Sequence, residues 1–217
     1  MKVGLIGVGL MNGSLALDLK SAHPSVLIYG VSRTETTLSN AMELGLIDHR
    51  ATIDELKDMD LVSVAIPVEA TASLLPNILD AVGPKTLVID MGSTKTAICE
   101  SVAQHPKREQ FLACHPIAGT EFSGPQAAIR NLYKDKVNML CETHKTRPEL
   151  LERARSIFTN LGMQLREIEP IAHDRHIAYV SHLSHITSFM LGKTVMEKEE
   201  DEQNIFDMAG SGFSSTV

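Results

Sequence analysis

The sequence has few cysteines, and their spacing fits neither a disulfide framework nor a zinc site. Cys99, Cys114 and Cys141 are odd in number, lie far apart and form no C-x-x-C pair. Disulfide-rich proteins carry dense, even-numbered cysteines, and zinc sites usually pair two of them closely in the sequence. We therefore expect three buried thiols, with no disulfide and no metal centre.

The sequence also lacks a cluster of lysine and arginine residues, and it has no apolar run long enough to span a membrane. Its formal net charge of −7 argues against a surface for nucleic acid or for an anionic membrane. Because Met1 and Lys2 run directly into an apolar segment with no signal peptide before it, we expect a cytoplasmic protein. Its basic residues should act locally, as anion ligands.

What the sequence does contain is a regular alternation of apolar runs and helical patterns. Hydrophobic residues make up 43% of the 217 residues, enough for one sizeable domain and part of another. The alternation predicts an α/β protein of the Rossmann type, with a doubly wound, mainly parallel sheet in residues 1–168. Strands are expected at 3–6, 26–31, 61–66, 86–90, 111–114, 136–140 and 163–168, and helices at 34–44, 69–81, 96–102 and 147–161. Residues 169–217 show no strand signal and predict the start of a helical domain, with one long helix over about 171–197.

The first strand leads into a glycine turn that is typical of dinucleotide-binding folds. Gly7 and Gly9 lie between the apolar run 3–6 and a helical pattern that begins near Leu10 and Met11. Glycine lets the chain turn tightly and approach a pyrophosphate, which the start of the helix then binds. Asn12 stands where the third glycine of the pattern is expected, and we expect this change to loosen the phosphate turn slightly. An ordinary strand–turn–helix junction is the alternative.

The end of the second strand selects the cofactor. An NAD site usually has an acidic residue here for the ribose hydroxyls, whereas this chain has Ser32, Arg33 and Thr34. A guanidinium can bind the additional phosphate of NADP, so we favour NADP over NAD. The alternative is that Arg33 is a solvated turn residue that stacks on adenine. After the third strand, Pro67 and Thr71 are also expected to line the cofactor, although simple loop packing would explain them nearly as well.

Polar residues follow two later strands, and they should lie at the same edge of the sheet as the glycine turn. Ser93 follows the strand at 86–90 and could reach a ligand hydroxyl or simply cap the next helix. Lys95 is read as an ordinary surface residue. His115 follows the strand at 111–114 and opens a loop of small, hydroxyl and acidic residues. Histidine can accept a proton from an alcohol near neutral pH while a hydride leaves its carbon, but a structural histidine bonded to a carbonyl is the alternative.

The long helix carries a histidine pair. His182 and His185 are three residues apart and therefore share a helical face with Tyr179. A polar stripe facing the crevice of the sheet fits this pattern better than a metal site, because no further ligand cluster accompanies the pair. The acidic run 197–202 is interpreted as a solvated helix end or linker.

Five motifs together are similar to those of the prephenate/arogenate dehydrogenase family of tyrosine biosynthesis, and the resemblance covers the whole chain. They are Gly7-Val-Gly-Leu, Asp90-Met-Gly-Ser-Thr-Lys95, His115-Pro-Ile-Ala-Gly-Thr-Glu121, Ser181-His-Leu-Ser-His185 and Gly210-Ser-Gly-Phe213. The resemblance implies a cofactor-dependent oxidative decarboxylation of prephenate to 4-hydroxyphenylpyruvate, or of arogenate to tyrosine. It also implies a homodimer through the C-terminal helices.

The same resemblance implies roles for individual residues. His115 matches the histidine that takes the proton of the ring hydroxyl, and Ser93 matches the serine that orients that hydroxyl. Glu121 matches an acidic gate residue beside Thr120 in the substrate loop, and His182 and His185 match residues that line the substrate site.

The chain also departs from the family pattern. The arginine that binds the substrate carboxylate should follow Phe213, but the sequence ends at Val217 without one, so we expect this chain to be a fragment of a longer one. Ser32 and Arg33 resemble the NADP-using arogenate branch. The alternatives are an NADP-dependent reductase of the β-hydroxyacid or imine type and a non-catalytic NADP-sensing protein.

Overall fold

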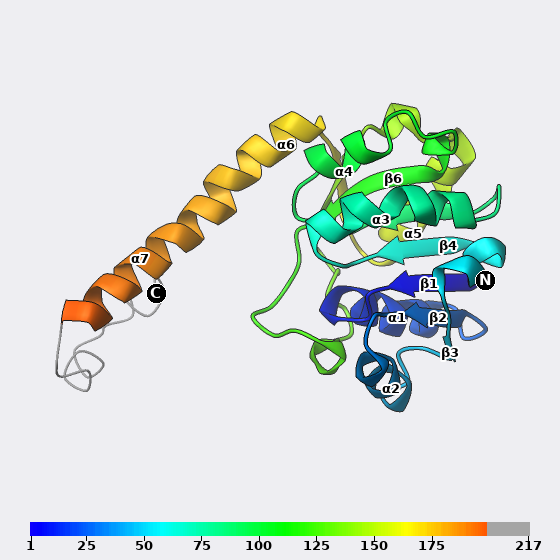
Figure 1. Ribbon diagram of the computed structural model, residues 1–217, viewed down its shortest axis with the longest axis horizontal. Helices are drawn as coiled ribbons and strands as arrows, with labels where there is room; N and C mark the ends of the chain where they lie inside the picture. Colours follow the sequence, from blue (N-terminus) through cyan, green and yellow to red (C-terminus); the bar gives the residue numbers. More distant parts are fainter. Residues whose placement is uncertain (199–217) are drawn as a thin grey trace. The chain divides into compact units, whose positions relative to one another are not determined.

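A sheet of eight strands occupies the centre of the first of two units in this computed structural model, which describes residues 1–198 (Figure 1). The units are Met1–Ile171 and Ala172–Val217, and the predicted division at residues 168 and 169 lies close to this boundary. The strands are β1 (Lys2–Ile6), β2 (Leu27–Val31), β3 (His49–Arg50), β4 (Leu61–Val64), β5 (Leu87–Asp90), β6 (Phe111–Pro116), β7 (Val137–Cys141) and β8 (Gln164–Glu167).

The strand order is β3-β2-β1-β4-β5-β6-β7-β8, and the first six strands in this order run parallel. β7 is antiparallel to β6, and β8 is parallel to β7. This arrangement confirms the predicted doubly wound, mainly parallel fold. In such a sheet the carboxyl ends of the parallel strands share one edge, where ligands bind. The sequence pattern missed β3, because its two residues pair only with Tyr29 and Gly30 and carry no apolar signal.

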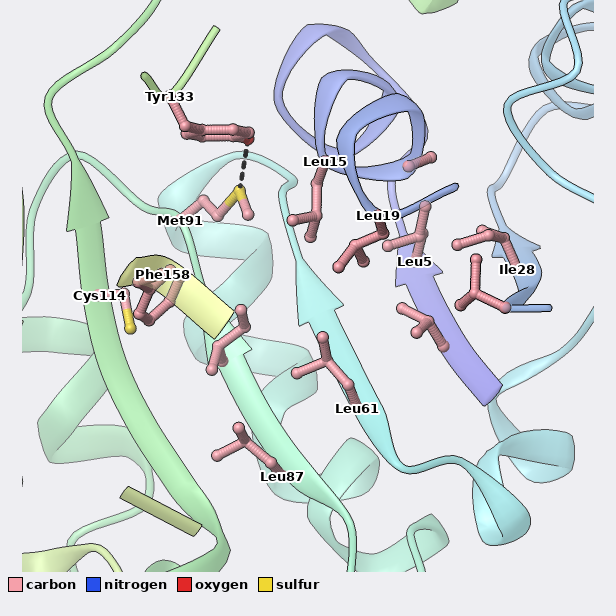
Figure 2. Packing of buried hydrophobic residues seen from close by; sticks show 14 of the residues in the cluster. Leu5, Leu15, Leu19, Ile28, Leu61, Leu87, Met91, Cys114, Tyr133 and Phe158 are labelled. Carbon is pink, nitrogen blue, oxygen red and sulfur yellow. Dashed lines mark hydrogen bonds between the residues drawn. The ribbon is translucent and has the colours of Figure 1, made fainter. Parts of the chain in front are cut away.

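Helices cover both faces of the sheet because successive strand residues point to opposite sides. Leu61 belongs to a hydrophobic cluster that includes residues of α1 (Leu10–Ala22), α2 (Glu35–Glu43) and α5 (Pro148–Asn160), whereas its neighbour Val62 belongs to a second cluster that includes residues of α3 (Val68–Ala81) and α4 (Thr96–Ser101). Figure 2 shows the first of these clusters, with Leu15 and Leu19 of α1 directed toward the strands. Short 3₁₀ turns complete the unit: η1 (Ile53–Asp58), η2 (Arg108–Gln110), η3 (Pro125–Ala127) and η4 (Thr143–Lys145).

The three cysteines all lie within this core. Cys99, Cys114 and Cys141 are all buried, which confirms that part of the prediction. Burial raises the pKa of the Cys99 thiol to about 12, and it raises the pKa of Cys114 well above its usual value. Both thiols are therefore held in their unreactive, protonated form.

The described part of the second unit, up to residue 198, is helical, as predicted. The helix consists of α6 (Pro170–Ile177), a π-helical segment, η5 (Ala178–His182), and α7 (Leu183–Lys198). Its large apolar side chains are extensively exposed, among them Tyr179, Val180, Leu183, Ile186, Phe189 and Met190. Within residues 1–198, no helix combines the length and apolarity that crossing a membrane requires. The acidic residues 199–202 and the motif 210–213 lie outside the described part of the chain.

A partly buried ion pair at the far end of β7 makes the stability of the fold depend on pH. Burial by itself would raise the pKa of Glu142, but hydrogen bonds from Lys145 (2.6 Å) and Arg108 (2.8 Å) outweigh it and hold the pKa below 4.5. A carboxylate with a lowered pKa stabilises the folded state at higher pH, and this contribution is lost as the pH falls through the folded-state pKa.

We therefore expect Glu142→Gln to destabilise the protein at neutral pH, where it leaves the buried Arg108 without its charged partner. The difference in unfolding free energy between the variant and the original chain should shrink as the pH falls below about 4.5. Urea unfolding curves measure this difference, and they should be recorded from about pH 3 to about pH 7 because this range includes the titration of a glutamate carboxyl. A difference in unfolding free energy that stays constant over this pH range would contradict a stabilising role for the ionised Glu142.

Candidate active site

The glycine turn joins β1 to α1 at the edge where the parallel strands end. Gly7 has φ +79°, and a Cβ atom there would lie 2.5 Å from the carbonyl oxygen of Ala65, so no other residue fits. At Gly9, no described atom lies within 4 Å of where a Cβ would be, and no described side chain caps the start of α1. Leu10 and Met11 form the first turn of that helix. This open helix start can accept an anion.

Asn12 does not loosen this turn, and our expectation from the sequence was wrong in that respect. Its side chain is fully buried, and its Nδ2 donates to the carbonyl oxygens of Ile6 (3.1 Å), Gly7 (2.9 Å) and Ser63 (3.1 Å). Its Oδ1 accepts a hydrogen bond from the Ser63 hydroxyl at 2.7 Å. Asn12 thus ties β1, the turn, α1 and β4 together, which a glycine could not do.

The turn is also fixed from the other side. The buried hydroxyl of Tyr133 donates to the carbonyl oxygen of Met11 at 2.6 Å and lies 3.4 Å from the sulfur of Met91 (Figure 2). At Gly13, an added Cβ would lie 2.7 Å from the Cβ of Ala128, so the helix approaches this loop closely. The glycine next to Asn12 therefore serves the close packing of α1.

A cleft of about 620 Å³ lies beside the turn. Gly7, Ser32, Arg33, Thr34 and Pro67, all predicted cofactor residues, line it together. The sequence did not point to the remaining lining residues, which are Ile6, Val31, Thr37, Ile53, Ile66, Glu69, Ala70 and Leu74. Their apolar side chains offer a surface for a flat aromatic ring, such as adenine. Nothing local in the sequence marked them, because the cleft forms from four separate segments.

The polar end of this cleft carries hydroxyl groups around Arg33. The hydroxyls of Thr34 and Thr37 lie 2.6 Å apart, and the Ser32 hydroxyl accepts from the backbone N–H of Thr34 at 3.4 Å. Within residues 1–198, no hydrogen bond or ion pair engages the exposed guanidinium of Arg33. Arg50, by contrast, pairs with Glu35. The loop thus presents an available cation and several hydroxyl donors to a ligand.

Thr71 is placed differently from the other predicted cofactor residues. Its side chain is buried, and its hydroxyl donates to the carbonyl oxygens of Ile66 and Pro67, both at 3.2 Å. It is not part of the cleft lining. Its observed contacts instead fasten the start of α3 to the loop after β4.

Ser93 follows β5 and His115 lies at the end of the adjacent strand β6, at the same sheet edge as the glycine turn. His115 is half-buried near the end of β6, and Ser93 is exposed in the loop between β5 and α4. β5 and β6 are parallel neighbours. The fold therefore brings to one edge two polar side chains that lie 22 positions apart in the sequence.

Lys95 is not a surface residue, contrary to the expectation from the sequence. Its side chain is fully buried and forms an ion pair with Asp90, which is also fully buried at the end of β5. The signal that could have revealed this pair was Asp90 itself. A carboxylate at the end of an otherwise apolar, buried strand needs a charged partner nearby.

The substrate residues suggested by the family resemblance fall into two groups. Thr120 and Glu121 are exposed in the loop after β6, where the Thr120 hydroxyl accepts from the N–H of Phe122 at 3.3 Å. The backbones of His182 and His185 belong to η5 and α7 in the second unit. Their side chains lie outside the part of the chain that the structure describes.

Comparisons with known protein families match almost the whole chain. Residues 15–167 match the family described as "Prephenate dehydrogenase, nucleotide-binding domain". Residues 169–217 match "Prephenate dehydrogenase, dimerization domain". The first match lies within the first unit and begins after the glycine turn, and the second match includes the whole of the second unit.

Individual relatives agree with this result. Prephenate dehydrogenase from Bacillus subtilis is 31% identical over 213 residues, which cover 96% of this chain but only 57% of that protein. The structure of prephenate dehydrogenase from A. aeolicus in complex with hydroxyphenyl propionate and NAD⁺ matches with a TM-score of 0.88 and 30% identity, over 100% of this chain and 76% of that one. Synechocystis arogenate dehydrogenase matches with a TM-score of 0.81 and 31% identity, over 100% of this chain and 77% of that one.

Proposed function

Because the chain belongs to the prephenate dehydrogenase family, we propose that it oxidises the ring carbinol of prephenate or arogenate with a nicotinamide cofactor and releases the ring carboxylate as CO₂. The observation that carries this proposal is the position of Ser93 just after β5 and of His115 at the end of the adjacent parallel strand β6. They share the sheet edge with the glycine turn and its cleft. This edge is where ligands of such sheets bind.

The roles of the side chains follow from their chemistry. Ser93 orients the ring hydroxyl, and His115 accepts its proton, because imidazole is the side chain best suited to act as a base near neutral pH. The bound cofactor supplies the hydride acceptor. Aromatisation of the ring then makes loss of the carboxylate favourable. Thr120, Glu121, His182 and His185 are assigned to the binding of the substrate.

The cleft is suited to the adenosine end of the cofactor. Val31, Ile53 and Leu74 line it with apolar groups that can contact adenine, and the pyrophosphate would lie at the start of α1. We assign NADP as the preferred cofactor, because the ribose end of the cleft holds Arg33 and the hydroxyls of Thr34 and Thr37. A carboxylate partner for the ribose hydroxyls is absent from positions 32–34.

We expect Arg33→Ala to weaken NADP binding by about 10–100-fold, since a charge-assisted hydrogen bond contributes roughly 1.5–3 kcal/mol. NAD binding should change little, because NAD lacks the additional phosphate. Titration of the cofactor by calorimetry measures both affinities. An equal loss for NAD and NADP would assign Arg33 to adenine stacking instead, and an unchanged NADP affinity would remove it from the site.

We also propose a homodimer formed through the C-terminal helices. The match to a dimerisation domain supports it, as do the exposed apolar side chains of the helix, with Phe189 78% and Val180 73% exposed. Apolar surface of this extent is normally covered by a partner. Light scattering gives the mass in solution directly, and a monomer at micromolar concentration would contradict the proposal.

The proposed reaction is tested in four assays, in which the full chain is mixed with prephenate or arogenate and with NADP or NAD. Reduction of the cofactor is followed by absorbance. Turnover in any combination supports the proposal, and the preferred combination identifies the substrate and the cofactor. Cofactor binding without turnover in all combinations would favour the second candidate, a protein that senses NADP without chemistry.

A further inference from the structure

We propose that the buried ion pair of Asp90 and Lys95 is a positioning device that holds Ser93 and His115 in register with each other. The inference rests on the proposed function for the roles of these two residues. Both members of the pair are 0% exposed. They lie between the ends of β5 and β6, where the two candidate catalytic residues emerge.

The Asp90 carboxylate accepts hydrogen bonds from the segment that follows β5 and from the end of β6. Its Oδ2 accepts from the backbone N–H of Gly92 at 2.8 Å and from the ammonium group of Lys95. Its Oδ1 accepts from the backbone N–H of Cys114 at 3.0 Å. Gly92 directly precedes Ser93, and Cys114 directly precedes His115. One carboxylate therefore anchors the residue before each candidate catalytic side chain.

Lys95 also binds the backbone of Cys114, at its carbonyl group. Its Nζ donates to the carbonyl oxygen of Cys114 at 2.6 Å, so both the N–H and the C=O of Cys114 are bound by the pair. Backbone pairing between β5 and β6 runs through Val88 with Phe111 and Ile89 with Leu112. Beyond these positions, the hydrogen bonds from Asp90 and Lys95 to the backbone of Cys114 also connect the two strands.

The geometry requires that residue 90 accept hydrogen bonds at both of its side-chain positions, Oδ1 and Oδ2. An asparagine could place its oxygen at only one of these two positions, and its NH₂ group would face a donor at the other. A buried ion pair is also a weak source of stability, because desolvation offsets most of the attraction. Apolar residues could fill the same space, and they would not hold the backbone of Cys114 in place.

The test compares catalysis with stability in three variants. Asp90→Asn and Lys95→Met each leave one buried charge unpaired, and each should lower Tm by roughly 6–20 °C. The double variant Asp90→Asn with Lys95→Met removes both charges and should regain most of that Tm. Its kcat should nevertheless stay about 10²-fold below that of the original chain, because misplacement of reacting groups by about 1 Å has this effect. The KM for the cofactor should change by less than about 3-fold, since the glycine turn is not altered.

Arg108→Met is the matched control. Arg108 is buried, pairs with Glu142 and donates to the carbonyl oxygen of Phe111 at 2.7 Å, at the opposite end of the same strand. Arg108→Met should lower Tm as the two single variants do. Its kcat should equal that of the original chain at temperatures where the variant is folded. If the double variant regains kcat together with Tm, the ion pair has only a structural role and the proposal is overturned.

A second readout does not depend on turnover. The imidazole NMR signals of His115, assigned by their loss in His115→Asn, should shift or broaden in the double variant and remain unchanged in Arg108→Met. Unchanged signals in the double variant would overturn the positioning role even if no substrate is turned over. Failure of the original chain in all four assays, with shifted His115 signals, would instead overturn only the proposed reaction.

Discussion

Replacement of His115 by asparagine should lower turnover by about 10²–10⁴-fold, the usual contribution of a general base. Asparagine keeps hydrogen-bonding atoms and a similar size, but it cannot take a proton from the substrate hydroxyl. The affinity for the cofactor should be unaffected, because His115 is not among the residues that line the cofactor cleft. Steady-state kinetics and a cofactor titration measure the two effects separately.

His23→Asn is the control for this substitution. His23 is an exposed histidine at the far end of α1, away from the carboxyl ends of the strands. The control should retain full activity. A His115→Asn variant with nearly unchanged turnover would remove His115 from the chemistry. It would favour a reductase of the β-hydroxyacid or imine type, which would not need this histidine.

Asn12→Ala should destabilise the protein by about 2–4 kcal/mol, since several buried groups lose their hydrogen-bond partner at once. The carbonyl oxygens of Gly7 and Ser63 and the hydroxyl of Ser63 all bond to the Asn12 side chain. Cofactor affinity should fall as well, because the same bonds hold the turn that approaches the pyrophosphate. Chemical denaturation and a cofactor titration measure these two losses.

Asn160→Ala provides the comparison for Asn12→Ala. Asn160 is exposed in the last turn of α5, and its replacement should change the unfolding free energy by less than about 0.5 kcal/mol. Equal, small effects at both positions would show that the buried network around Asn12 contributes little. In that case the glycine pattern, rather than Asn12, would determine the shape of the turn.

The sequence predicted those parts of the fold whose signals are local. Apolar runs such as Val3–Ile6 and 86–90 correspond to the observed strands Lys2–Ile6 and Leu87–Asp90. The helices predicted over 34–44 and 147–161 are each followed by a glycine, Gly45 and Gly162, and both glycines have positive φ, +67° and +78°. Ser32, Arg33 and Thr34 could be placed at a strand end because the apolar periodicity stops there.

Features that depend on contacts between distant residues could not be predicted in this way. Asn12 was read against a glycine pattern, yet its role depends on Ser63, 51 positions away. Lys95 looked like any exposed lysine, because nothing in its neighbours shows that Cys114 lies against it. The cleft likewise combines Thr37, Ile53 and Leu74 from segments that show no common motif.

The three buried thiols also offer a way to follow opening of the sheet. The chain has no tryptophan, so intrinsic fluorescence gives little signal for unfolding. Cys99, Cys114 and Cys141 sit on α4, β6 and β7, and at most 3% of each side chain is exposed. A thiol-specific reagent can modify them only when these elements separate, so the labelling rate reports how often each element opens. Comparison of the three rates would show whether α4 separates before the strands do.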